Sequence, residues 1–125
     1  MANKFQRLLR EIKQTRKRRR ERATLDVNAE GFVLTRRHKP VSLKWDEVTE
    51  IAAGSLAIFS GEIFYAVVSG DGLRLEIDEF VEGFNNFEAA LFRHFPSTRG
   101  RFTELQIEAA GDDRLEVLWK SGDAR

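Results

Sequence analysis

The residues with the types needed for acid–base chemistry follow a predicted strand in the middle of the chain. They are Asp78, Glu79 and Glu82. Carboxylates at such short spacing can hold Mg²⁺ or transfer protons. The same residues also suit the first turn of a helix, where a carboxylate accepts backbone N–H groups and the helix dipole favours negative charge. We interpret them as helix-capping residues, because capping requires no further ligand or base.

Other residue types that serve catalysis or metal binding are sparse. The sequence contains two histidines, His38 and His94, and no cysteine. Neither histidine has a second ligand at a spacing typical of zinc sites, and no nucleophile-elbow, Walker A, dinucleotide-binding or EF-hand motif occurs. His94 is expected near the C-terminus of a helix, where a positive charge is favoured. The sequence therefore predicts a protein that is not an enzyme and that uses no metal, no cofactor and no small-molecule substrate.

Basic charge is concentrated at the N-terminus. Residues 1–22 contain ten Lys or Arg and two Glu, a net charge of +8, whereas residues 23–125 contain eleven Lys or Arg and eighteen Asp or Glu, a net charge of −7. The densest part of the positive charge, here called the basic run, consists of Arg16, Lys17, Arg18, Arg19 and Arg20. Such an asymmetry predicts an arm that binds an anionic partner or the acidic remainder of the chain.

The basic run is a candidate anion-binding site with two kinds of external ligand. Phosphate groups of nucleic acid attract such a cluster regardless of base sequence, although the run contains no aromatic residue to stack on bases. An acidic membrane surface attracts the same charges at about 1 kcal/mol per basic residue. Ion pairs with the acidic body of the chain are a third alternative, in which each exposed pair contributes roughly a few tenths of a kcal/mol.

An amphipathic pattern precedes the basic run. Its apolar residues, here called the apolar stripe, are Phe5, Leu8, Leu9 and Ile12. Their spacing of i, i+3, i+4 and i+7 places all four on one face of a helix, which we predict over about residues 2–14. The stripe is a candidate docking face for a protein partner, for a second copy or for the domain itself. It is also suited to shallow insertion into a membrane surface.

From Ala23 onward the apolar residues alternate with a period of two, which is typical of strands. The predicted strands, in chain order, are 24–27, 31–35, 41–45, 56–59, 63–68 and 73–77, with a bend or short strand at 46–51. The segment 63–68 is nearly all apolar, as expected for a central strand that is covered on both faces. Phe59 and Phe64 flank a predicted turn, so they are candidates for an exposed apolar tip.

A change to helical spacing follows the last of these strands. The apolar residues of this segment are Phe80, Phe84, Phe87, Leu91, Phe92 and Phe95. They predict a helix over about residues 79–95, with Asp78 as its cap and Pro96 after its end. Aromatic residues at this spacing fill a core more often than they bind a cofactor. Gly83 within the segment predicts close packing against another backbone. Two further strands are expected at 103–109 and 114–119.

Several of these segments resemble a known family. They are Trp45–Ile51, the turn Gly70–Gly72 with the strand 73–79 that follows, the pair Gly83–Phe84, and Phe87–Pro96. Together they resemble small bacterial proteins with a pleckstrin-homology-like (PH-like) domain, over roughly the middle half of the chain. The resemblance implies a curved antiparallel sheet that forms a partly open barrel plugged by the helix. The two strands after the helix are an addition to the family pattern, in which the helix comes last.

A chain of 125 residues is typical of a single domain. We predict an α+β domain over residues 23–120 in which one mostly antiparallel sheet closes around the helix, with a basic helical arm at 1–22 and a loose tail at 121–125. The sequence shows neither a signal peptide nor about 18 consecutive apolar residues, so a cytoplasmic location is expected.

These observations predict a non-enzymatic binding or scaffold domain. Its N-terminal helix would mediate association with a protein partner or with a second copy of the chain. The alternative is a protein that binds an acidic membrane or nucleic acid through the basic run.

Overall fold

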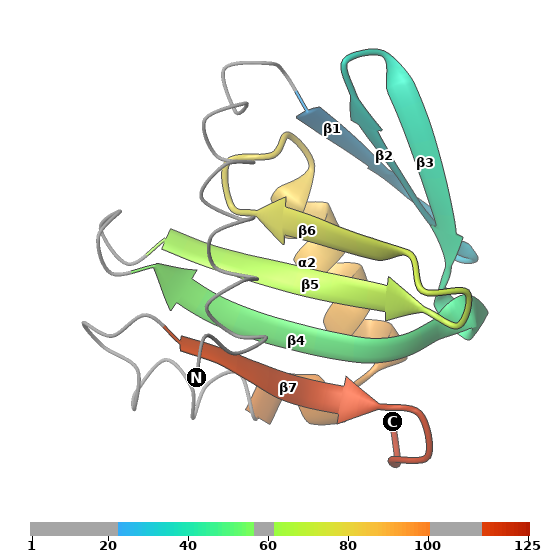
Figure 1. Cartoon of the computed structure of the whole chain (residues 1–125), viewed down its shortest axis with the longest axis vertical. Helices are drawn as coiled ribbons and strands as arrows, with labels where there is room; N and C mark the ends of the chain where they lie inside the picture. Colours follow the sequence, from blue (N-terminus) through green and yellow to red (C-terminus); the bar gives the residue numbers. More distant parts are fainter. Residues whose placement is uncertain (1–22, 57–61, 101–113) are drawn as a thin grey trace.

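The computed structural model describes residues 23–56, 62–100 and 114–125. Within these ranges the chain is an α+β domain whose mostly antiparallel strands form two sheets, with helix α2 (Phe84–His94) packed against them (Figure 1). The predicted α+β class with mostly antiparallel strands is thereby confirmed. The predicted helix over about residues 2–14, the predicted strand 103–109 and residues 57–59 of the predicted apolar strand lie outside the described residues.

The first sheet contains three antiparallel strands in chain order. They are β1 (Ala23–Val27), β2 (Gly31–Arg36) and β3 (Lys39–Lys44). The side chain of Asn28 forms the turn between β1 and β2, because its Oδ1 atom accepts hydrogen bonds from the backbone N–H groups of Glu30 (2.8 Å) and Gly31 (3.0 Å). The strands predicted at 24–27 and 31–35 are confirmed.

The second sheet contains four antiparallel strands in the order β6-β5-β4-β7. They are β4 (Val48–Leu56), β5 (Glu62–Ser69), β6 (Arg74–Asp78) and β7 (Arg114–Lys120). The expectation of one sheet is wrong for the described strands. The short 3₁₀ helix η2 (Trp45–Glu47) separates β3 from β4, so the strand hydrogen bonding of the first sheet does not continue into the second.

An aromatic cluster between α2 and the sheets forms the centre of the core. Phe87 lies at its centre, with its ring 5.0 Å from that of Phe32 on β2, 6.1 Å from that of Trp45 and 6.0 Å from that of Tyr65 on β5. Phe84 and Leu91 on the same face of the helix are also buried. The prediction that helically spaced Phe residues fill the core is confirmed for these positions.

The start of the helix differs from the prediction. Helix α2 begins at Phe84, and Gly83 rather than Asp78 is at the N-cap position. Residues 79–83 form a turn in which the backbone of Glu82 exchanges hydrogen bonds with the backbone of β1, with Leu25 as donor (2.8 Å) and Ala23 as acceptor (3.2 Å). Glu82 thus pairs with a strand that is distant in sequence, although the local sequence around Asp78 and Glu79 favours the start of a helix. Phe80 therefore lies in the turn and is 60% exposed.

Gly83 is confirmed as a site of close packing. Its φ is +92°, and a Cβ atom at this position would lie 2.5 Å from the backbone oxygen of Leu25. Only glycine adopts this left-handed backbone at low cost and leaves room for the neighbouring strand.

The C-terminal residues 121–125, for which the sequence predicts a loose tail, contact the domain. The backbone oxygen of Arg125 accepts a hydrogen bond from Ser97 N–H (2.7 Å), in a segment, 97–100, that is again helical. The guanidinium of Arg125 lies 4.6 Å from the centre of the Phe95 ring, and Trp119 Nε1 donates to the backbone oxygen of Asp123. These contacts connect the end of the chain to the end of α2.

Candidate functional site

The acidic residues singled out by the sequence have structural partners. The carboxylate of Asp78 accepts a hydrogen bond from Phe80 N–H (2.9 Å), and that of Glu79 accepts one from Ile63 N–H (3.3 Å). Glu82 pairs with β1 through its backbone. These residues stabilise the turn that follows β6 instead of capping a helix. Among the residues that the structure describes, no group of three or more His, Asp or Glu is placed to hold a metal ion.

The two sequence-predicted binding elements lie outside the described residues. They are the apolar stripe, Phe5, Leu8, Leu9 and Ile12, and the basic run, Arg16, Lys17, Arg18, Arg19 and Arg20. Both stay predictions. The described strands and helix have two surfaces to which these segments could bind.

One such surface is the side of the four-stranded sheet opposite α2, here called the outer face. Strand alternation sends Ala53, Tyr65 and Val67 into the core and their neighbours to the other side. The described residues of the outer face include Ala52, Gly54, Phe64, Ala66, Glu76 and Val117, which are cross-strand partners or near neighbours in register. Figure 1 shows α2 behind the sheet and no other described helix or strand in front of it.

The centre of the outer face is apolar and, apart from Phe64, made of small residues. Ala52 and Ala66 are cross-strand partners, and Gly54 pairs with Phe64 on the same two strands. Phe64 and Ala66 are each 2% exposed, although neither belongs to the hydrophobic core on the α2 side. The expectation that Phe64 lies at an exposed tip is wrong. The prediction that segment 63–68 forms a strand covered on both faces is confirmed.

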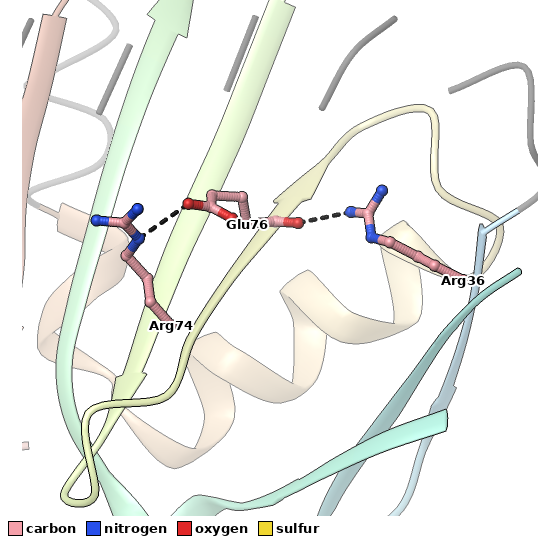
Figure 2. A network of polar contacts seen from close by, with 3 residues as sticks. All are labelled: Arg36, Arg74 and Glu76. Atoms are coloured by element: carbon pink, nitrogen blue, oxygen red, sulfur yellow. Dashed lines mark hydrogen bonds and ion pairs between the residues drawn. The ribbon is translucent and has the colours of Figure 1, made fainter. Parts of the chain in front are cut away.

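A polar network borders the outer face along β6 (Figure 2). Arg74 Nε lies 2.9 Å from Glu76 Oε1, an ion pair whose members are both partly exposed. Arg36, at the end of β2 in the other sheet, donates from Nη2 to the backbone oxygen of Glu76 at 2.7 Å. This bond joins the two sheets. It also places the start of β1 near β6, because Ala23 is the register partner of Arg36.

A second surface is a groove along the solvent side of α2, with a volume of about 840 Å³. It is lined by Asn85, Glu88, Ala89, Phe92, Arg93, Pro96 and Arg99. The hydroxyl of Tyr65 donates to Glu88 Oε2 at 2.6 Å. Burial, and then the hydrogen bond and negative charge of Glu88, raise the pKa of Tyr65 far above its usual value. The phenol thus stays protonated and serves as a structural donor, not as an acid or nucleophile.

His94, the last residue of α2, also has a structural role. Its ring stacks on that of Trp45, with centres 4.9 Å apart and planes at 22°. Its Nε2 atom is buried without a hydrogen-bond partner. Burial lowers the pKa of His94, and the positive charges of Arg93 and Arg125 lower it further against the opposing effect of Asp46. These effects oppose the helix dipole, which favours a positive charge at this position.

The partly buried His94 predicts a loss of stability in mild acid. A pKa lower in the folded than in the unfolded chain means that unfolding takes up a proton, so stability decreases as the pH falls below the unfolded value of about 6.5. We expect His94→Phe, which keeps an aromatic ring against Trp45, to remove the part of this decrease that comes from protonation of His94 below about pH 6.5. Urea unfolding at several pH values measures the effect.

The exposed histidine is the control. His38 lies in the β2–β3 turn with a φ of +63°, a conformation that asparagine tolerates. His38→Asn therefore removes an imidazole from an exposed turn and is the matched substitution for comparison. An unchanged pH dependence in His94→Phe would contradict the assignment.

The outer face and the α2 groove could not be named as sites from the sequence. The continuous apolar segment 63–68 was the available signal for the outer face, because a strand with only one buried face alternates. No comparable signal exists for the groove, since its residues come from one face of α2 and from the segment 96–99 that follows it.

The described ranges contain no helix long and apolar enough to cross a membrane. Comparisons with protein-family models, with curated proteins and with solved structures found no match to this chain.

Proposed function

We propose that this chain is a non-enzymatic binding or scaffold domain of PH-like architecture that acts in the cytoplasm. Its N-terminal segment, residues 1–22, mediates association with a protein partner or with a second copy of the chain. The described part supplies a rigid support for this role, since two antiparallel sheets and α2 share one aromatic core.

The observation that carries the proposal is the outer face. Large apolar residues of one segment pack well over small residues on a neighbouring surface, because small side chains let the backbones approach closely. The outer face presents Ala52, Gly54 and Ala66 at its centre, whereas the apolar stripe consists only of Phe, Leu and Ile. The sequence thus contains both halves of an apolar interface. The opposed charges of residues 1–22 and 23–125 favour the encounter of such segments.

Light scattering and pulldown experiments with the full chain test the proposal. Changing Leu8 and Ile12 to Asp places two charges on the stripe and is expected to abolish self-association or partner retention, because burying an unpaired charge is costly. Equal masses and equal sets of retained proteins for the two chains would contradict the role of the stripe.

A matched variant distinguishes the alternative function, anion binding by the basic run, from association through the apolar stripe. Replacing Arg18, Arg19 and Arg20 with Ser keeps the apolar stripe and removes three charges of the basic run. If acidic vesicles or DNA retain the unaltered chain at low salt, and this triple variant alone loses that retention, the basic run is the binding element. Two exposed basic residues, Arg37 in the β2–β3 turn and Lys39 at the start of β3, add positive charge to the described surface and are the observation in favour of this alternative.

A further inference from the structure

The outer face is buried in a single chain. Phe64 and Ala66 are each 2% exposed and Ala52 is 4% exposed. The described elements do not account for this burial, because the core cluster excludes all three residues and α2 lies on the opposite side of the sheet (Figure 1). Three segments of the same chain lie outside the described residues and are candidates for the cover, namely residues 1–22, 57–61 and 101–113.

The position of Ala23 favours the first of these segments. Ala23 is the register partner of Arg36, and the Arg36 side chain bonds to the backbone of Glu76 on β6 (Figure 2). Residues 1–22 thus join the described domain close to one edge of the outer face. The eight residues 15–22 span up to about 26 Å when extended, which is enough to reach the middle of the sheet from that edge.

Length and side-chain size also fit. A helix over residues 2–14 would be about 20 Å long, whereas the four strands of the sheet span about 14 Å from the first to the last. Such a helix can cross all four strands. The small residues Ala52, Gly54 and Ala66 leave room beneath it for the Phe, Leu and Ile side chains of the apolar stripe.

The other two segments fit less well. Residues 57–61 join two adjacent antiparallel strands at one end of the sheet, so a five-residue connection cannot cover its centre. Residues 101–113 follow the helical segment 97–100, whose Ser97 bonds to the chain terminus near the end of α2. They contain no apolar residues at the i, i+3, i+4 and i+7 spacing of the stripe.

We infer that the apolar stripe docks on the outer face of its own chain, centred on Ala52, Phe64 and Ala66. The inference rests on the proposed binding role of residues 1–22 and adds a way in which that binding is regulated. A partner segment or a second copy must displace the stripe to reach the outer face. The apolar stripe belongs to the same molecule as the outer face, so its docking does not depend on protein concentration, whereas the binding of a partner does. The stripe therefore competes with the partner and keeps association weak until the stripe is released.

Thiol accessibility tests the docking directly, because the chain contains no cysteine. We choose Ala66→Cys in the full chain, with Ala52→Cys as an independent second position on the neighbouring strand. The reaction of each thiol with Ellman's reagent is measured in the otherwise unaltered chain and in the Leu8→Asp/Ile12→Asp background. Docking predicts slow reaction in the first and a rate at least about tenfold higher in the second.

Two further single cysteines control for the fold. Ala90→Cys lies in the core on α2, where Ala90 is 0% exposed, and is expected to react slowly in both backgrounds. Phe80→Cys, at a residue that is 60% exposed in the turn before α2, is expected to react fast in both. If the Asp pair also makes Ala90→Cys reactive, the domain has opened, and the milder Leu8→Ala/Ile12→Ala pair provides the deciding comparison.

Three results would overturn the inference. A fast reaction of Ala66→Cys in the unaltered background means that the outer face is open. Equal protection in both backgrounds means that another segment covers it. Protection that is lost on dilution means that the cover belongs to a second copy. None of these results depends on light scattering, so a protected thiol in a chain that stays monomeric and binds no partner would support docking while contradicting the proposed association.

Discussion

Phe87→Ala is expected to lower the free energy of unfolding by about 3–5 kcal/mol, the range for removing a large aromatic side chain from a packed core. This is the largest effect that we expect from a single truncation. Phe87 is 0% exposed and contacts rings from both sheets, Phe32 on β2 and Tyr65 on β5. Its loss therefore leaves a cavity where helix and sheets meet, not at the margin of the core.

Chemical denaturation followed by the fluorescence of Trp45 and Trp119 measures this change. Phe80→Ala is the matched control, because it removes the same side chain from a turn where more than half of it is already exposed. We expect a much smaller loss there. Similar losses at the two positions would show that the aromatic cluster does not hold the sheets together.

Gly83→Ala is expected to cost about 3 kcal/mol, the second largest effect. About 1 kcal/mol comes from the left-handed backbone, since φ is +92°. The remainder comes from overpacking, which typically costs about 1–3 kcal/mol, because the new methyl group would lie 2.5 Å from the backbone oxygen of Leu25. The chain cannot relieve this contact without moving Glu82, whose backbone pairs with β1.

Gly72→Ala separates the two contributions to this cost. Gly72 has almost the same φ, +90°, but no atom lies within 4 Å of the position of its Cβ. It should therefore show the backbone strain alone. Equal free energies of unfolding for the two alanine variants would mean that the contact with Leu25 carries no cost and that β1 is free to shift.

The parts of the fold that were predictable from the sequence are those with a local period. The helical spacing of Phe84, Phe87 and Leu91 predicts a core-facing helix, and the alternation in the β1–β2 hairpin predicts antiparallel strands; both are present. The helix start was mispredicted because residues 79–83 bond to β1, which is more than 50 residues earlier in the chain. No local pattern contains that information.

The candidate site was harder to predict for the same reason. The protonation preference of His94 depends on its burial beside Trp45, a contact between residues far apart in sequence. The outer face is assembled from strands whose order, β6-β5-β4-β7, places the last strand beside the fourth. The all-apolar segment 63–68 indicated that two faces were covered, but could not indicate by which residues.

The bond from Arg36 to Glu76 also bears on the solubility of the domain. Strand β6 lies at the edge of its sheet, and unpaired backbone groups at such an edge recruit strands from other molecules and start aggregation. The guanidinium of Arg36 donates a hydrogen bond to the carbonyl oxygen of Glu76, the middle residue of this five-residue strand. An incoming strand would have to break a charge-assisted hydrogen bond to pair there, so one arginine protects the sheet from intermolecular growth along this edge.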